Sequence, residues 1–197
     1  QFLEARCFES IVFLNLESTW KAIPLPDEAQ ISPLFGIGIG DFNNDGMEDL
    51  VGSQNFFGVN ALDSRQDAGM GLLLFGNGDG TFTASLPASS GIAIRGEGRG
   101  LAVADFDHDG RADFIATQHS GPTKLYRNLE QKVGLAVRLK GPAGNLQAIG
   151  AKGRLIYENG SKGPTREWRL GDGYWSQLRL RALHASSRRS GSTLRAR

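Results

Sequence analysis

Two stretches of this chain place oxygen-bearing side chains at the same spacing. Each follows the frame Asp-Phe-(Asn/Asp)-x-Asp-Gly-x-x-Asp, one from Asp41 to Asp49 and the other from Asp105 to Asp113. Oxygen ligands at positions 1, 3, 5 and 9 of this frame, with a glycine at position 6 that permits a sharp turn, suit a hard cation that takes about 6 to 8 oxygens. The frame therefore predicts one calcium ion in each loop, about two in all.

Each loop is expected to supply four side chains and, at position 7, a backbone carbonyl. The predicted ligands of the first loop are Asp41, Asn43, Asp45, Met47 and Asp49, and those of the second are Asp105, Asp107, Asp109, Arg111 and Asp113. The second loop offers four carboxylates, whereas the first offers three and one amide. Because the charge of the ligands tunes calcium affinity, this count predicts tighter binding in the second loop.

The flanks of the loops distinguish them from an EF-hand, which is framed by helices and ends in Glu at position 12. Position 12 is Gly52 in the first loop and Ala116 in the second, and the segments 100–104 and 112–117 are short, apolar and without helical period. The pattern predicts β-hairpin loops in which the ninth-position Asp replaces the missing Glu. Asp, Asn and Gly are also common in solvated turns, but the repetition of four ligand positions favours a metal site.

The segments between the loops repeat as well. Residues 12–22 and 74–84 both read as strand, Asn-led turn and strand, and 124–128 matches only the first half of that pattern. The repeating unit is therefore four strands, which is typical of propeller blades. The glycine-rich segments 36–40 and 96–100 lack the spacing of a phosphate-binding loop, so we expect them to be strands whose glycines lie where blades crowd together.

The Asp-rich motifs, together with Asn-Gly-Asp-Gly-Thr-Phe at 77–82, resemble FG-GAP/VCBS repeats, the blades of integrin α-chain propellers and of many bacterial secreted proteins. The resemblance implies an all-β fold: a partial β-propeller of four-stranded blades over residues 1–131, which starts inside a blade. In that family the Asp-rich hairpin loop binds calcium, and the location is extracellular, periplasmic or at the cell surface.

A second resemblance begins near Gly134. The segments 134–141, 148–155 and 171–177 resemble the ASPIC/UnbV domain, which commonly follows FG-GAP repeats. The resemblance implies a small β-rich domain over residues 132–180, incomplete at its C-terminal end. Residues 181–197 form a basic Ser/Arg-rich tail, a composition typical of disorder.

Composition limits the classes of partner. The 197 residues include 22 Lys and Arg against 21 Asp and Glu, a balance that gives no support to nucleic-acid binding. No run of 18 apolar residues occurs, so we expect no membrane insertion. The abundance of Gly, 27 residues, is typical of many short strands and tight turns.

These features favour a calcium-binding scaffold that interacts with a protein or carbohydrate ligand and with the remaining blades of a longer chain. No set of nucleophile, base and oxyanion donors is visible, so we do not expect catalysis. The alternative is a propeller-type enzyme acting on polysaccharide or another polyanion, with Asp63, Arg65 and Asp67 in the long connection 55–69 as its candidate cluster. A calcium sensor would need a pair of helices to open, and the sequence predicts none.

Overall fold

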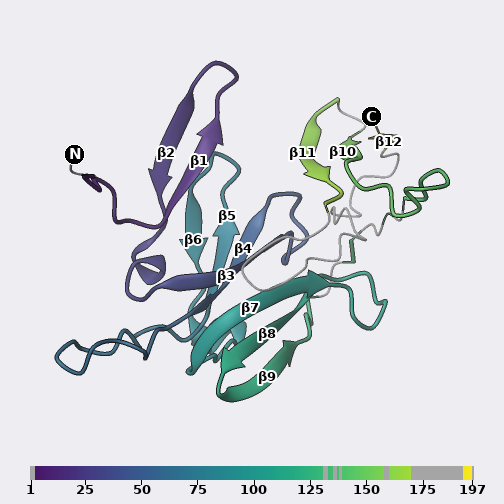
Figure 1. Ribbon diagram of the computed structural model, residues 1–197. Coiled ribbons are helices and arrows are strands. Elements are labelled where there is room, and N and C mark those ends of the chain that lie inside the picture. The colour runs from purple at the N-terminus through teal and green to yellow at the C-terminus, as the bar shows by residue number, and fades with distance from the viewer. Residues whose placement is uncertain are drawn as a thin grey trace.

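The structure, a computed structural model, describes residues 3–130, 133–134, 137, 139–157, 160–169 and, for the backbone, 193–196. These residues form an all-β fold of antiparallel sheets with almost no helix (Figure 1). The strands are β1 (Ile11–Asn15), β2 (Trp20–Pro24), β3 (Leu34–Gly40), β4 (Asp49–Gln54), β5 (Leu72–Gly76), β6 (Phe82–Ala84), β7 (Glu97–Ala104), β8 (Asp113–His119), β9 (Gly121–Tyr126), β10 (Lys152–Ile156), β11 (Lys162–Glu167) and β12 (Thr193–Ala196). The two short helices are the 3-10 turn η1 (Asp27–Ala29) and α1 (Pro87–Ser90).

The four-strand unit expected from the repeat is present in full once among the described residues, in the order β3-β4-β5-β6. The next sheet, β7-β8-β9, repeats the first three of these strands. The β1–β2 hairpin corresponds to the last two strands of such a unit, as the match of 12–22 to 74–84 predicts. The fourth strand of that unit has no counterpart among the described residues, and the next strand along the chain is β10.

The β3–β6 sheet lies between the β1–β2 hairpin and the β7–β9 sheet (Figure 1). Neighbouring residues of β4 point to opposite faces, as the two-residue period of a strand requires. Leu50 packs with Leu72, Leu74 and Val12 on the hairpin side, whereas Val51 belongs to the core on the β7–β9 side. Each face of this sheet is therefore covered by a different neighbour.

The inner strands β3 and β7 approach each other closely because β3 presents glycines to its neighbour. A Cβ on Gly36 would lie 2.5 Å from the carbonyl oxygen of Arg99, and one on Gly38 would lie 2.5 Å from side-chain atoms of Leu101 and Val103. The prediction that these glycines mark strands at a crowded contact is confirmed. The alternating Ile37 and Ile39 point away from β7 and remain partly exposed.

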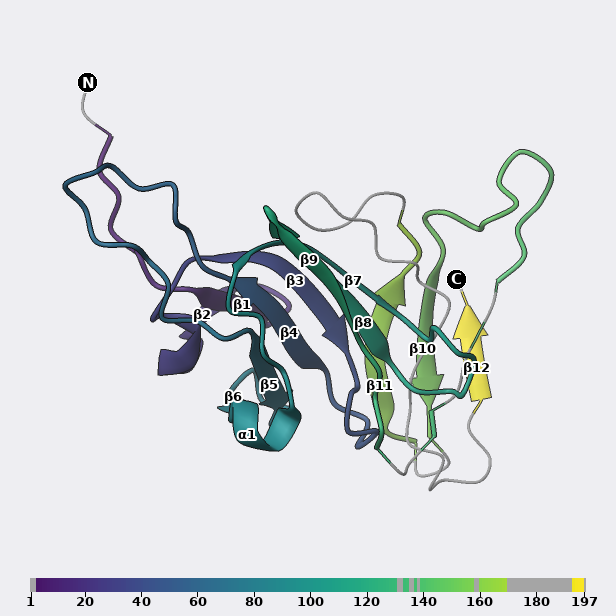
Figure 2. The same ribbon diagram turned by 90° about the horizontal axis from the view of Figure 1, so that it is seen from below.

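Asn55 organises the start of the long connection between β4 and β5. Its side chain is fully buried and its backbone is left-handed, with φ 86°. The amide donates to the carbonyl of Gly69 over 2.8 Å, and its Oδ1 accepts from the N–H of Gly69 over 2.9 Å and from the hydroxyl of Ser32. These bonds join the two ends of a loop that extends away from the sheets (Figure 2).

The C-terminal part forms a separate three-stranded sheet in the order β11-β10-β12. Leu155 and Trp168 form the buried hydrophobic cluster of this part, with Val137 and Leu139 packed against them. The tail 181–197 was expected to be disordered, but residues 193–196 form β12, because the free edge of β10 pairs with their backbone. The rest of that tail and the segment 171–177 lie outside the described residues.

Candidate metal sites in two aspartate-rich loops

The two Asp-rich loops occupy equivalent places in successive sheets. The first joins β3 to β4, with Gly40 paired to Asp49, and the second joins β7 to β8, with Ala104 paired to Asp113. Each loop therefore connects the first two strands of its sheet, as the sequence predicts.

Of the described part of the chain, no helix is long and apolar enough to cross a membrane.

The backbone turns in the same way in both loops. Position 6 is left-handed in each, with φ 95° at Gly46 and 83° at Gly110, which explains the glycine. Position 4 is also left-handed, with φ 53° at Asn44 and 61° at His108. The frame did not predict this second turn position, since it is occupied by different residue types in the two loops.

The Asp at position 1 fixes this turn by accepting two backbone hydrogen bonds. Asp41 accepts from the N–H of Asp45 over 3.0 Å and of Gly46 over 2.9 Å. In the second loop, Asp105 accepts from position 5 over 3.0 Å and from position 6 over 3.1 Å. The position 5 carboxylate then accepts from the N–H of position 7, over 2.8 Å at Met47 and 3.0 Å at Arg111. The two loops therefore have the same pattern of internal hydrogen bonds.

The Asp at position 9 joins three parts of its sheet. Asp49 accepts from the N–H of Phe42 over 2.7 Å and from the N–H of Gly76, at the end of β5, over 3.0 Å. Asp113 accepts in the same manner from Phe106 and from Asn128. The sequence predicts position 9 as a ligand, and the structure adds that this carboxylate ties the loop to the third strand.

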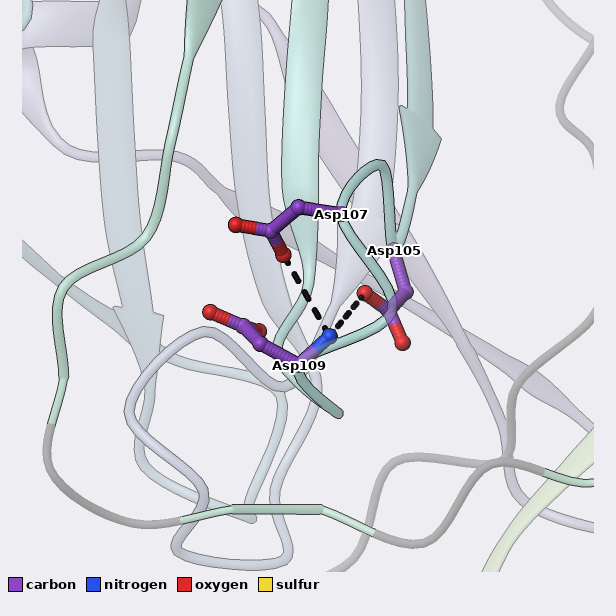
Figure 3. Close-up of side chains that lie close together, drawn as sticks. All are labelled: Asp105, Asp107 and Asp109. Carbon is purple, nitrogen blue, oxygen red and sulfur yellow. Dashed lines mark hydrogen bonds between the residues drawn. The ribbon is translucent and has the colours of Figure 1, made fainter.

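Asp105, Asp107 and Asp109 bring carboxylate oxygens within 4.8 Å of one another, an arrangement that could hold a metal ion (Figure 3). The position 9 carboxylate of Asp113 is outside this triad. In the first loop the amide of Asn43 takes the place of the middle carboxylate, and its Nδ2 donates to Asp45 over 2.9 Å. The carbonyls of Met47 and Arg111 stay predicted ligands.

Burial of two carboxylates in the first loop raises their pKa values. Asp41 is 2% exposed and Asp49 is fully buried. Loss of hydration raises the pKa of Asp41 to about 7 and that of Asp49 to about 6, although backbone N–H groups oppose both shifts. Among the residues that the structure describes, no Lys or Arg forms an ion pair with Asp41, Asp45 or Asp49.

The second loop differs because arginines contact its carboxylates. Arg111 Nη1 lies 2.7 Å from Asp109 Oδ2, and Arg127 Nε lies 2.5 Å from Asp107 Oδ2. Burial acts to raise the pKa of Asp109, but hydrogen bonds from Arg111 and Arg127 outweigh it and the pKa lies below its usual value. Burial raises the pKa of Asp113. No short-range pattern connects Arg127 with this loop, since it lies 18 residues beyond Asp109.

Arg166 of β11 contacts the first loop from the C-terminal sheet. It forms an ion pair with Glu48, at position 8, and its Nη1 donates to the carbonyl of Ile39 over 3.3 Å. Burial raises the pKa of Glu48 in spite of this partner. Arg166 thus joins the residues on either side of the loop, and no short-range sequence pattern could predict a contact across 118 residues.

The cluster suggested for an enzyme lies on the extended loop after β4. Arg65 forms an exposed ion pair with Asp67, N to O 3.6 Å, and its guanidinium lies 3.9 Å from the ring centre of Phe57. Within the described part of the chain, Asp63 forms no ion pair with Arg65. Two exposed, mutually neutralised side chains do not provide a buried acid or base.

The donors in both loops are carboxylate, amide and carbonyl oxygens, which fit a hard cation such as calcium and not a soft metal. Residues 41–116, which run from the first Asp of one loop through the other and into β8, match the profile of the FG-GAP-like repeat. FG-GAP repeats often bind calcium, occur in extracellular proteins and are typically non-catalytic scaffolds. The match covers both Asp-rich loops.

The chain is also similar to part of a known human protein. A stretch of 59 residues is 41% identical to cartilage acidic protein 1 of Homo sapiens. The aligned stretch covers 29% of this chain and 9% of the human protein. The chain is thus similar to a short part of a much longer protein.

Proposed function

We propose that this chain is a calcium-stabilised part of a β-propeller, built from FG-GAP-like blades and followed by an ASPIC/UnbV-like β domain. Its role is that of an extracellular, periplasmic or cell-surface scaffold that binds a protein or carbohydrate ligand. The observation that carries the proposal is the repetition of one loop network at equivalent places in two stacked sheets. The profile match over both loops supports it.

Calcium would supply the positive charge that balances the carboxylates of the loops. When bound, the ion would attract the carboxylates and carbonyls that otherwise repel one another or are deprived of water. Asp41 and Asp105 hold the turn through backbone N–H groups, so the oxygens at positions 3 and 5 are positioned before an ion arrives. Asp49 and Asp113 transmit the loop geometry to β5 and to the end of β9. The protein's part is therefore to preorganise an anionic loop at the end of each sheet.

The scaffold role follows from the extended connection between β4 and β5, since long loops on rigid sheets commonly carry binding sites. Arg65 and Asp67 give it exposed charged groups beside the half-buried ring of Phe57. Such a surface suits a polar partner, either a protein or a carbohydrate.

Thermal unfolding of the full chain tests the calcium part of the proposal. A ligand that binds only the native state stabilises it by RT ln(1 + [L]/Kd), about 2.7 kcal/mol at a hundredfold excess over Kd. Affinities of extracellular modules are roughly 10⁻⁴ to 10⁻³ M, so millimolar calcium should raise the melting temperature by several degrees. Magnesium serves as the control, because it requires a smaller and more regular oxygen shell. Identical melting curves in calcium and in chelator would disprove calcium binding.

A further inference from the structure

Two of the three clustered carboxylates in the second loop already have cationic partners. Arg127 directly follows β9; its Nε lies 2.5 Å from Asp107 Oδ2 and its Nη2 3.3 Å from Asp109 Oδ2. Arg111 shares that second oxygen at 2.7 Å. Oδ2 of Asp107 and of Asp109 therefore contacts guanidinium groups, while Oδ1 of each accepts a backbone N–H. Figure 3 shows the bond from the N–H of Asp109 to Asp107.

Among the described residues, no Lys or Arg forms an ion pair with Asp41, Asp45 or Asp49 of the first loop, and strand register explains this difference from the second loop. Leu50 pairs with Leu74 in one sheet and the equivalent Phe114 pairs with Tyr126 in the other. The residue that follows Leu74 is Phe75, so Arg127 occupies the position of an uncharged phenylalanine. At position 7, likewise, Met47 stands where the second loop has an arginine.

These contacts change the charge that an entering ion would encounter. The second loop has four carboxylates and two contacting arginines, which leaves a net charge of −2. The first loop has three carboxylates with no Lys or Arg paired to them among the described residues, a net charge of −3. Counting ligand carboxylates alone ranks the second loop as tighter, whereas counting the contacting arginines ranks the first loop as tighter.

We propose that Arg127 is an internal competitor for the cation in the second loop, so that calcium binds the first loop more tightly and fills it first. The inference rests on the proposed calcium function. The Arg127 side chain is 58% exposed, so it can leave the carboxylates without disturbing the core. Arg111 is only 21% exposed and also contacts the carbonyl of Glu130, so it is the less movable of the two.

Calorimetric titration of the full chain with calcium tests this proposal. Asp45→Ala removes a ligand of the first loop, so the remaining binding reports the second. In that background, Arg127→Gln should tighten binding about tenfold, the effect of removing a unit charge within a few ångströms of a divalent ion in a water-like dielectric. Arg127→Lys, which retains the charge, should bind like the parent within about twofold.

Arg65→Gln is the matched control, because Arg65 is 57% exposed and also forms an ion pair with an Asp. Its affinity for calcium should stay within about twofold of the parent, and circular dichroism should show that each variant is folded. Unchanged or weaker binding in Arg127→Gln, when the parent binds calcium, would overturn the competitor role alone. If the unsubstituted chain, the Asp45→Ala chain and its Arg127→Gln variant all fail to bind calcium at 10 mM, calcium binding itself is wrong. Binding by the second loop that appears only after Arg127→Gln would support the competitor role.

Discussion

Burial of Asp41 and Asp49 predicts that the metal-free protein loses stability as the pH rises from 5 to 8. Their pKa values of about 7 and about 6 in the folded chain lie above the usual 3.8. Between the unfolded and the folded pKa, the native state retains protons that the unfolded chain has released. Stability is therefore fully present below about pH 4 and declines until the pH has passed about 7.

The magnitude follows from proton linkage. For Asp41, the free energy of unfolding falls by about 2.6 kcal/mol between pH 5 and pH 8, and for Asp49 by about 1.4 kcal/mol. The two carboxylates influence each other, so we expect a total of about 3 kcal/mol, which corresponds to roughly 10 °C in melting temperature. Glu48 and Asp113, whose pKa values are also raised, act in the same direction. Groups with lowered pKa values change stability only at more acidic pH.

Scanning calorimetry at pH 5, 6.5 and 8, with and without calcium, measures this effect. Calcium needs ionised carboxylates, so the increase in melting temperature that it causes should be small at pH 5 and largest at pH 8. Asp41→Asn should reduce the pH slope in chelator, whereas Asp79→Asn, in an exposed turn, should leave it unchanged. A metal-free melting temperature that is constant or rises from pH 5 to 8 would refute the argument.

Further predictions concern the scaffold. Gly76→Ala should lower the free energy of unfolding by more than about 2 kcal/mol in urea denaturation, because the new Cβ would lie 2.2 Å from the carbonyl oxygen of Glu48; a loss below 0.5 kcal/mol would contradict this close contact. Asn55→Ala should cost about 2 to 3 kcal/mol and hasten proteolytic cleavage between β4 and β5, and an unchanged cleavage rate would show that the loop does not depend on this side chain. Arg166→Ala should increase hydrogen exchange in β10 and β11. Equal exchange in the variant and the parent would argue against a stabilising role for the contact between Arg166 and Glu48. The edge of β9, which pairs with no further strand among the described residues, should promote self-association, and a monodisperse monomer in light scattering would disprove this.

Local patterns were sufficient to predict the hairpins and their Asp-rich loops. The alternation of Gly and Ile in β3 and the positive φ at Gly46 and Gly110 follow from requirements within a few residues, and the structure has them where the sequence places them. The repeat then predicts which strands pair, because equivalent loops require equivalent flanks. For the same reason the β1–β2 hairpin could be predicted by its match to β5 and β6.

The charge environment of the loops could not be predicted in this way. Arg127 and Arg166 reach the loops from 18 and 118 residues away, through strand register and through the packing of a separate sheet. A slip of one residue in β9 would exchange Arg127 for its neighbour and alter the charge beside Asp107. The motif predicts which groups can bind an ion, but long-range contacts decide how strongly each loop attracts it.

The contact of Arg166 with Glu48 and Ile39 joins the C-terminal sheet to one end of a blade. Residues on either side of the first loop are thereby held by a side chain of the C-terminal sheet. A force applied to that sheet would be transmitted to the turn around Asp41. A calcium ion in that turn, as proposed above, would hold Glu48 in place for Arg166. We therefore expect the contact between the C-terminal sheet and the blade to be more stable in calcium than in chelator.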